Sequence, residues 1–196
     1  MLTVDAPVSG GVRGATDRTL TFMAGGSDAA FARAAPFFDA MGRTAIHCGP
    51  SGAGQAAKIC NNMILGVTML ATCEAFVRAD SLGLDRQKLF DVVSTSSGAN
   101  WSMNTYCPAP GVGPASPADN DYQPGFAAEL MLKDLLLSQQ AAETGNISTP
   151  LGARAAVLYQ QFIADGGQGK DFSAVLPYLM RRGRSGNPVE SQALRT

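Results

Sequence analysis

Two polar residues on one predicted helix face could carry acid–base chemistry. Lys58 and Asn62 lie four residues apart, so a helix places both on the same face, amid apolar neighbours. Burial disfavours the ammonium form of a lysine, so Lys58 could exchange a proton with a substrate hydroxyl near neutral pH. Asn62 would then position the same substrate. The alternative is a lysine whose apolar stem lies along the core while its amine reaches the surface.

A second lysine and a glycine-rich turn are further candidates. Lys133 falls in a helix that is apolar nearly all round and is predicted to point inward, where its charge needs either Asp134 or a ligand anion as partner. Ser9, Gly10 and Gly11 follow a predicted strand, and their hydroxyl and unhindered backbone N–H groups suit a carboxylate. An ordinary turn also explains these three residues.

The segment Gly52–Ala57 has the G-x-G-x-x-A pattern of a dinucleotide-binding turn. It follows a predicted strand and opens a helix, and Glu74 comes about twenty residues later. In the dinucleotide motif, however, the acidic residue ends a second strand, whereas Glu74 lies inside a predicted helix. We therefore reject a pyrophosphate site here and expect the glycines to let the helix begin close to the preceding strand.

Composition argues against several other functions. The chain has 15 Lys+Arg and 16 Asp+Glu, so it offers no basic stripe for nucleic acid. Its four cysteines lack C-x-x-C spacing and it has one histidine, so no metal site is expected, and His47 and Cys48 are predicted to pack. The longest apolar run, Met63 to Cys73, is far shorter than the roughly 20 residues that cross a bilayer, so no membrane span is expected.

The elements that position the candidate residues change in character near residue 50. Short β-branched strands surround one helix before that point, and only helical periodicity follows it. Asp85 and Asp171 are predicted N-caps, and Gly145 and Gly166 are predicted C-caps. The predicted strands are 2–8, 19–24 and 44–48, with a Gly-rich loop over 9–15, and the predicted helices are 29–41 (bent or split at Pro36), 51–82, 85–95, a short one near Trp101, 126–144, 151–164 and 171–182.

The predicted sheet is incomplete. Three strands and one helix leave two open edges and one bare face, which an isolated protein does not expose to water. We expect either strands from another chain or a longer protein. Only 16% of the residues are charged, and the chain has eight Met and nine Phe, so we also expect hidden surface and an oligomer.

Taken in order, these segments resemble the β-hydroxyacid dehydrogenase family. The resemblance covers about residues 2–182, and its motifs are Asp5–Val12, Leu20–Gly26, Gly52–Asn62 and Lys133–Leu135. The 3-hydroxyisobutyrate dehydrogenase branch of the family is the most similar one. The segments that resemble this branch are Ser96–Gly98, Asn100–Ser102, Thr105–Tyr106, Pro110–Val112 and Tyr122–Phe126.

The resemblance implies a role for each candidate residue. Lys58 would be the catalytic acid/base, Asn62 would orient the substrate, and Ser9–Gly11 would bind the substrate carboxylate. Lys133 would contact the nicotinamide cofactor, and Phe126 would line the pocket. The cofactor implied is NAD, with NADP also allowed, and no metal is required.

The reaction implied is the NAD-dependent oxidation of 3-hydroxyisobutyrate to methylmalonate semialdehyde, a step of valine degradation, with Lys58 taking the hydroxyl proton. The expected partners are a small 3-hydroxy acid and further copies of the chain in a homodimer or homotetramer. Two alternatives stay open, a tartronate semialdehyde reductase-like enzyme and a non-catalytic oligomerisation module.

The resemblance also implies a fold, an α/β remnant followed by an all-α domain built on a long inter-domain helix. Residues 1–50 would be the last strands of a Rossmann-type domain, residues 51–182 the substrate and oligomerisation domain, and residues 183–196 a polar tail. The family's first strand, G-x-G-x-x-G turn and ribose-binding residue have no counterpart, and Arg18 replaces a small residue. We expect a cytoplasmic location in a bacterium or the mitochondrial matrix in a eukaryote.

Overall fold

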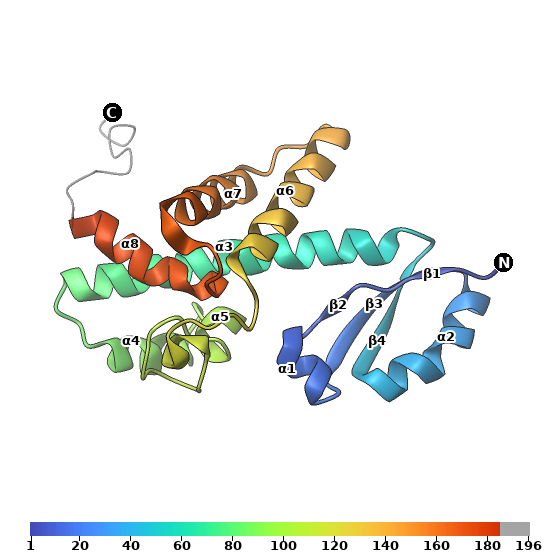
Figure 1. The fold of residues 1–196 in the computed structure, drawn as a ribbon, viewed down its shortest axis with the longest axis horizontal. Coiled ribbons are helices and arrows are strands. Elements are labelled where there is room, and N and C mark those ends of the chain that lie inside the picture. The colour runs from blue at the N-terminus through green and yellow to red at the C-terminus, as the bar shows by residue number, and fades with distance from the viewer. Residues whose placement is uncertain (185–196) are drawn as a thin grey trace. The chain divides into compact units, whose positions relative to one another are not determined.

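A computed structural model describes residues 1–184 (Figure 1). The chain forms two compact units. Unit 1 comprises Met1–Ile64 and Lys133–Ala153, and unit 2 comprises Leu65–Leu132 and the chain from Arg154 onward. The domain boundary predicted at residue 50 stays a prediction. Of the polar tail predicted over residues 183–196, Gly183 and Arg184 belong to a helix, and the residues from 185 on lie outside the described part of the chain.

The sheet of unit 1 is mixed. Its strands are β1 (Val4–Asp5), β2 (Val8–Ser9), β3 (Leu20–Gly26) and β4 (Gly42–Gly49). The central strand β3 pairs antiparallel with β1 and β2 on one side and parallel with β4 on the other.

The prediction of one continuous strand over residues 2–8 is wrong, because the strand is interrupted at Pro7. Proline has no N–H to donate to the ladder, but the Pro7 carbonyl accepts a hydrogen bond of 2.9 Å from the Met23 amide. The pairs Asp5–Gly25 and Val8–Phe22 keep one register, so β1 and β2 form a single line along β3.

The predicted Gly-rich loop over residues 9–15 is also wrong, since most of it forms α1 (Gly11–Thr16). Gly10 and Gly11 have φ angles of 135° and 61°, which turn the chain out of β2 and into the helix. Gly14 is buried against Leu20, and a Cβ at this position would lie 3.2 Å from the leucine side chain. Packing against β3 therefore supplies the helix contacts that composition does not indicate.

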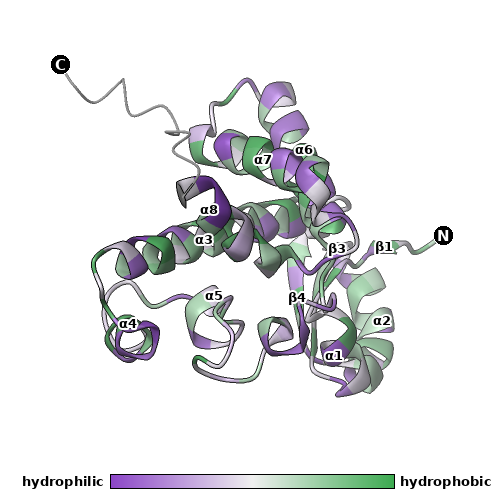
Figure 2. Cartoon of the chain, turned by 60° about the vertical axis from the view of Figure 1, so that its left-hand side comes forward, coloured by the Kyte–Doolittle hydropathy of each residue, from purple (hydrophilic) through white to green (hydrophobic). Residues whose placement is uncertain are grey.

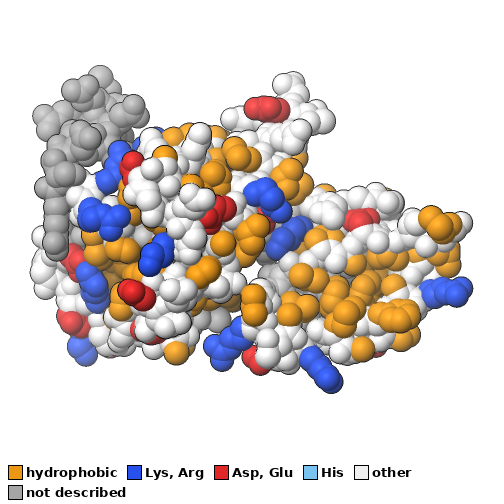
Figure 3. All heavy atoms as spheres, in the orientation of Figure 1, with side chains coloured by type: hydrophobic (Ala, Val, Ile, Leu, Met, Phe, Trp, Pro, Cys, Tyr) orange, Lys and Arg blue, Asp and Glu red, His pale blue; other side chains and the backbone are white. Residues whose placement is uncertain are grey.

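Helix α2 (Asp28–Met41) covers one face of the sheet and is not split at Pro36. Ser27 caps it by accepting a hydrogen bond of 3.2 Å from the Ala30 amide. Phe38 stacks on Phe22 of β3 with ring centroids 4.8 Å apart and forms the centre of this small core. On the face of unit 1 visible in Figure 3, hydrophobic side chains gather over the sheet and α2.

The long helix α3 (Ala53–Ser81) has a stripe of buried positions. Asn62, Gly66, Met69, Cys73 and Phe76 are all buried, at alternating spacings of four and three residues that define one face of a helix. Lys58 lies four residues before Asn62 along this stripe. The polar pair therefore occupies the start of a face that is otherwise apolar.

Helix α3 is also long and apolar enough to cross a membrane, by length and composition alone. Of its most apolar stretch, 39% is buried within the structure. The core helix of a soluble protein can have the same length and apolar composition. Figure 2 shows hydrophilic residues interspersed with hydrophobic ones on this helix. The expectation of no membrane span stays a prediction.

The remaining elements are helical. They are α4 (Arg86–Val93), α5 (Trp101–Asn104), η1 (Pro117–Asn120), α6 (Ala128–Thr144), α7 (Pro150–Phe162), the π-helical turn η2 (Ile163–Gly167), η3 (Phe172–Ala174) and α8 (Val175–Arg184). Asp85 and Asp171 cap α4 and η3 as predicted. After α6, Asn146 rather than Gly145 takes the left-handed conformation, with φ 50°, and closes the helix with the Ile147–Ala142 and Asn146–Glu143 backbone bonds.

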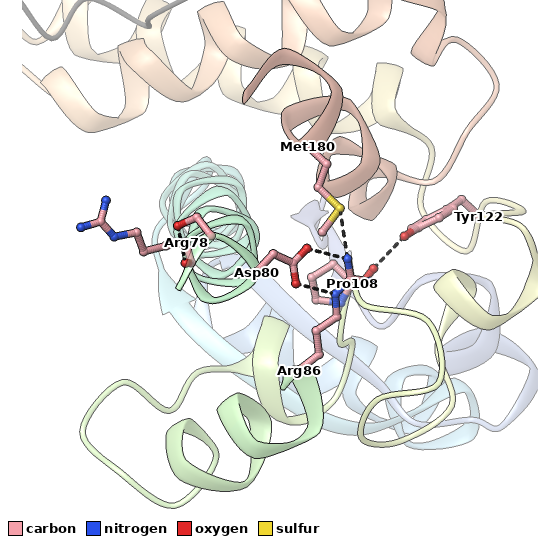
Figure 4. Close-up of polar contacts among 7 residues, drawn as sticks. Arg78, Asp80, Arg86, Pro108, Tyr122 and Met180 are labelled. Carbon is pink, nitrogen blue, oxygen red and sulfur yellow. Dashed lines mark hydrogen bonds and ion pairs between the residues drawn. The ribbon is translucent and has the colours of Figure 1, made fainter. Parts of the chain in front are cut away.

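Arg86 connects three helices within unit 2 (Figure 4). Arg86 donates to both carboxylate oxygens of Asp80, at 3.0 and 2.7 Å, and also contacts the sulfur of Met180 at 3.4 Å. These contacts connect the end of α3, the start of α4 and the middle of α8. Beside them, Tyr122 donates to the Pro108 carbonyl at 2.9 Å and fixes the Pro-rich loop.

The carboxylate of Asp171 in unit 2 is fully buried. It accepts hydrogen bonds from the Tyr106 hydroxyl at 2.8 Å, from the Gly125 and Phe126 amides at 3.0 Å each, and from the amide and hydroxyl of Ser173. Burial, together with the Asp171 charge, raises the pKa of Tyr106, so the phenol stays a donor.

We expect Asp171→Ala to lower the free energy of unfolding by about 3–5 kcal/mol, because it leaves several buried donors unpaired. Urea unfolding followed by the fluorescence of Trp101, which stacks on Tyr106 at 4.9 Å, measures this change. The control Asp91→Ala removes an exposed carboxylate and should cost less than about 0.5 kcal/mol. Equal costs for the two variants would contradict the role assigned to Asp171.

Candidate active site

The amine of Lys58 lies against the first residue of strand β2. Its Nζ donates to the Val8 carbonyl at 2.8 Å, and the side chain is half-buried. Burial lowers the pKa of Lys58, the negative charge of Asp134 opposes that shift, and the positive charge of Lys133 adds to it. The lysine is therefore neither fully buried nor the exposed surface lysine of the alternative interpretation.

Asn62 lies one turn further along α3 and is 2% exposed. Its Nδ2 donates to Oδ2 of Asp134 in a short hydrogen bond, and its Oδ1 accepts from Asn61 at 2.9 Å. Both ends of this amide are therefore satisfied, and its orientation is fixed. Asp134 is 8% exposed, and its other oxygen lies 3.1 Å from the amine of Lys133.

The prediction that Lys133 points inward is wrong. Its side chain is 61% exposed, because α6 turns Asp134 rather than Lys133 toward α3. Asp134 was one of the two partners predicted for the charge of Lys133. The ion pair between them at 3.1 Å confirms that prediction. The amine of Lys133 therefore stays accessible to a ligand.

Ser9, Gly10 and Gly11 directly follow Val8, whose carbonyl holds the Lys58 amine. Ser9 is the last residue of β2 and pairs with Thr21 of β3, and the chain then turns sharply at the two glycines. The structure therefore brings the predicted carboxylate-binding turn next to the predicted acid/base in unit 1. Phe126 belongs to unit 2, where its ring meets Phe172 edge-on at 5.6 Å.

The Gly52–Ala57 segment does not offer free amides to a pyrophosphate. Gly52 and Gln55 donate their backbone N–H groups to the carboxylate of Asp5, at 2.6 and 3.1 Å. A Cβ on Gly54 would overlap the Met23 carbonyl, so this glycine lets the helix begin close to β3. The close start of the helix is confirmed, and the absence of a pyrophosphate site stays a prediction.

The other polar candidates have structural partners. His47 bonds to the Gly26 carbonyl at 2.8 Å and stacks on Phe31 at 4.8 Å, as expected of a packing residue. Among residues 1–184, no three His, Cys, Asp or Glu side chains come together as a metal site would require.

Sequence reasoning missed two members of the site. Asp134 was considered only as a partner of Lys133, although its main contact is Asn62 of α3. The position of an aspartate inside an apolar helix indicates a buried acceptor, but not which helix supplies the donor. The Val8 carbonyl is a backbone group, and no side-chain pattern reveals it.

A half-buried amine, a fixed amide and a glycine turn are the parts needed to bind a small hydroxy acid by its carboxylate and to move a proton at its hydroxyl.

Two family models match the chain, and both describe NAD-binding proteins. Residues 1–49 match the NAD-binding domain of 6-phosphogluconate dehydrogenase. Residues 52–179 match the family described as NAD-binding of NADP-dependent 3-hydroxyisobutyrate dehydrogenase, and the chain belongs to this family.

Similar proteins support the family assignment. A 3-hydroxyisobutyrate dehydrogenase of Pseudomonas aeruginosa is 49% identical over 174 residues, and an NAD-dependent L-serine dehydrogenase of the same species is 48% identical over 172 residues. Each alignment covers 88% of this chain and 58% of the relative.

A solved structure of Mycobacterium tuberculosis 3-hydroxyisobutyrate dehydrogenase with L-serine is also similar, with 50% identity and a TM-score of 0.85. The match covers 90% of this chain and 60% of that one. This likeness confirms the predicted fold class, a remnant of a Rossmann-type sheet followed by an all-α part. The chain therefore spans 58–60% of the length of these three relatives.

The surroundings of Lys58 predict opposite effects of two neighbouring substitutions. Asp134→Asn removes a negative charge and should lower the pKa of Lys58 further, whereas Lys133→Met removes a positive charge and should raise it. A pH titration of the lysine side-chain signals by NMR, assigned with Lys58→Met, measures both shifts. Shifts in the same direction would contradict this description of the site.

Proposed function

We propose that this chain carries the substrate half of a 3-hydroxyisobutyrate dehydrogenase-type oxidoreductase, which oxidises 3-hydroxyisobutyrate to methylmalonate semialdehyde. The observation that carries the proposal is the bond between the Lys58 amine and the Val8 carbonyl, which holds a proton acceptor beside the Ser9–Gly11 turn. The family match over residues 52–179 supports it.

The substrate carboxylate would lie at Ser9–Gly11, where the serine hydroxyl and backbone amides can donate to it. This places the hydroxyl at the other end of the short substrate near Lys58. In the neutral amine, one N–H donates to Val8 and the lone pair remains to accept the hydroxyl proton. The lowered pKa of Lys58 increases the fraction of neutral amine at a given pH.

Asn62 would orient the substrate hydroxyl through the second N–H of its Nδ2, since Asn61 and Asp134 hold the amide in place. A bound NAD or NADP supplies the acceptor for the hydride that leaves the carbinol carbon. The exposed amine of Lys133 fits a contact with that cofactor, whereas the amides of Gly52 and Gln55 do not, because Asp5 occupies them. After transfer, Lys58 would hold the proton as an ammonium, which the negative charge of Asp134 favours.

L-Serine is a second candidate substrate. It is also a short 3-hydroxy acid, with an ammonium group where 3-hydroxyisobutyrate has a methyl group. A relative 48% identical to this chain is named an L-serine dehydrogenase, and the mycobacterial structure contains L-serine. The carboxylate turn and the Lys58 amine suit both substrates equally, so the 2-substituent decides between them.

The test is reduction of NAD and of NADP by the purified chain with each substrate. We expect turnover with 3-hydroxyisobutyrate and a loss of about 10²–10⁴-fold in kcat for Lys58→Met, because general base catalysis contributes that much. A higher kcat/KM with L-serine would favour the second candidate.

The matched control is Lys88→Met, which removes an exposed lysine of α4 and should leave turnover unchanged. Absence of turnover with all four pairs of substrate and cofactor, in a chain whose helical content is intact, would overturn the proposal for this chain. It would favour a non-catalytic assembly module.

We further propose that the chain forms a homodimer or homotetramer. Large apolar side chains are exposed on α6 and α7, among them Leu130, Leu136, Leu137, Leu151 and Val157. Burying such groups favours association. Sedimentation velocity should give twice or four times the mass of one chain, and a monomer at all concentrations would contradict the proposal.

A further inference from the structure

The carboxylate of Asp5 binds the first turn of α3. Oδ1 accepts from the Gly52 amide at 2.6 Å and Oδ2 from the Gln55 amide at 3.1 Å. The hydrogen bond from the Gly52 backbone amide is the main cause of the lowered pKa of Asp5, while partial burial opposes this shift. An anion is favoured at this place because the unpaired N–H groups and the dipole of a helix start both attract negative charge.

Glycines leave the room that this contact needs. A Cβ on Gly25, which pairs with Asp5 across the sheet, would lie 2.5 and 2.8 Å from the two carboxylate oxygens. A Cβ on Gly54 would lie 2.8 Å from Oδ2 of Asp5. Larger side chains at either position would displace the carboxylate or the helix, so the junction has one close-packed arrangement.

The same stretch of chain holds α3 at a second point. Asp5 contacts Gln55, and three residues further along both segments Val8 contacts Lys58. Three residues of extended chain advance about 10 Å, whereas three residues of helix rise about 4.5 Å. The lysine side chain bridges this difference, so its amine reaches Val8 only when the helix begins at the right place.

The strand segment between these two contacts is stiff. Pro7 has a restricted φ angle, and its carbonyl is bonded to Met23. Asp5 and Val8 also pair with β3, opposite Gly25 and Phe22. A shift of α3 at Gly52 therefore cannot be absorbed by the strand and is passed on to the amine of Lys58.

We propose that Asp5 is a positioning residue for Lys58, because it fixes the start of α3 on the strand whose next residues hold the lysine amine. This proposal rests on the proposed function where it concerns turnover, but its geometric part does not. Asp5 acts through α3 and does not touch the substrate. Its effect is therefore expected on kcat rather than on KM.

The test compares Asp5→Asn with Asp39→Asn, which changes an exposed carboxylate on α2. Asparagine has nearly the shape of aspartate, but its Nδ2 cannot accept the second amide. For Asp5→Asn we expect kcat with 3-hydroxyisobutyrate to fall by about 10²-fold, the cost of a displacement of about 1 Å, with KM changed less than about threefold. Asp39→Asn should match the wild type.

A second readout does not depend on turnover. The NMR signals of the Lys58 side chain should move in Asp5→Asn and stay in place in Asp39→Asn. Gly54→Ala retains aspartate at position 5, but its Cβ would collide with the Met23 carbonyl and the Asp5 carboxylate, so it should displace the helix start and move the same signals. If the wild type shows no turnover, the proposed function fails while these signals still decide the role of Asp5.

Three results would overturn the proposal. The first is an unchanged set of Lys58 signals in both Asp5→Asn and Gly54→Ala. The second is a normal kcat per folded molecule in Asp5→Asn despite lower thermal stability, which is the result of a purely structural cap. The third is a rise in KM that accounts for the whole loss of kcat/KM, because it would place Asp5 in substrate binding instead.

Discussion

A buried carboxylate must be compensated, and in unit 1 this requirement organises the candidate site. Asp134 lies on an apolar helix and is 8% exposed, so its charge needs donors within reach. It obtains them from the Asn62 amide and the Lys133 amine. The same charge opposes the desolvation that lowers the pKa of Lys58. One group thus fixes an amide, anchors an exposed lysine and limits how readily the half-buried lysine loses its proton.

Unit 2 meets the same requirement with a different set of donors. Asp171 is fully buried and has no cation in direct contact among the described residues, yet backbone amides and hydroxyls supply five hydrogen bonds. These donors are held in place by the fold itself, so such a site is rigid. The amine-based arrangement around Asp134 keeps a titratable group beside the carboxylate. The two aspartates therefore serve different ends, one structural and one suited to chemistry.

Much of this arrangement could be predicted from the sequence, because it depends on periodicity and on residue type. The spacing of Lys58 and Asn62 placed both on one face of α3, and the caps Asp85 and Asp171 marked true helix starts. The rest depends on contacts between distant segments. Local composition could not indicate that residues 11–16 pack on β3 as a helix, or that Lys133 faces outward, since only the packing of α6 decides which of two adjacent residues is buried. The role of a backbone carbonyl, that of Val8, leaves no trace in residue type.

The Asn62–Asp134 bond joins residues 72 positions apart, and this separation has a consequence for how the site is assembled. The strands β3 and β4 and the helix between them lie within one short stretch of chain, so they can pair early. Asn62 must wait for a much longer loop to close before it meets its acceptor. On a ribosome, which releases the chain from the N-terminus, the sheet and the start of α3 emerge well before α6 does. Any nascent chain that stops short of residue 134 would hold the lysine and the asparagine without the carboxylate that sets their state.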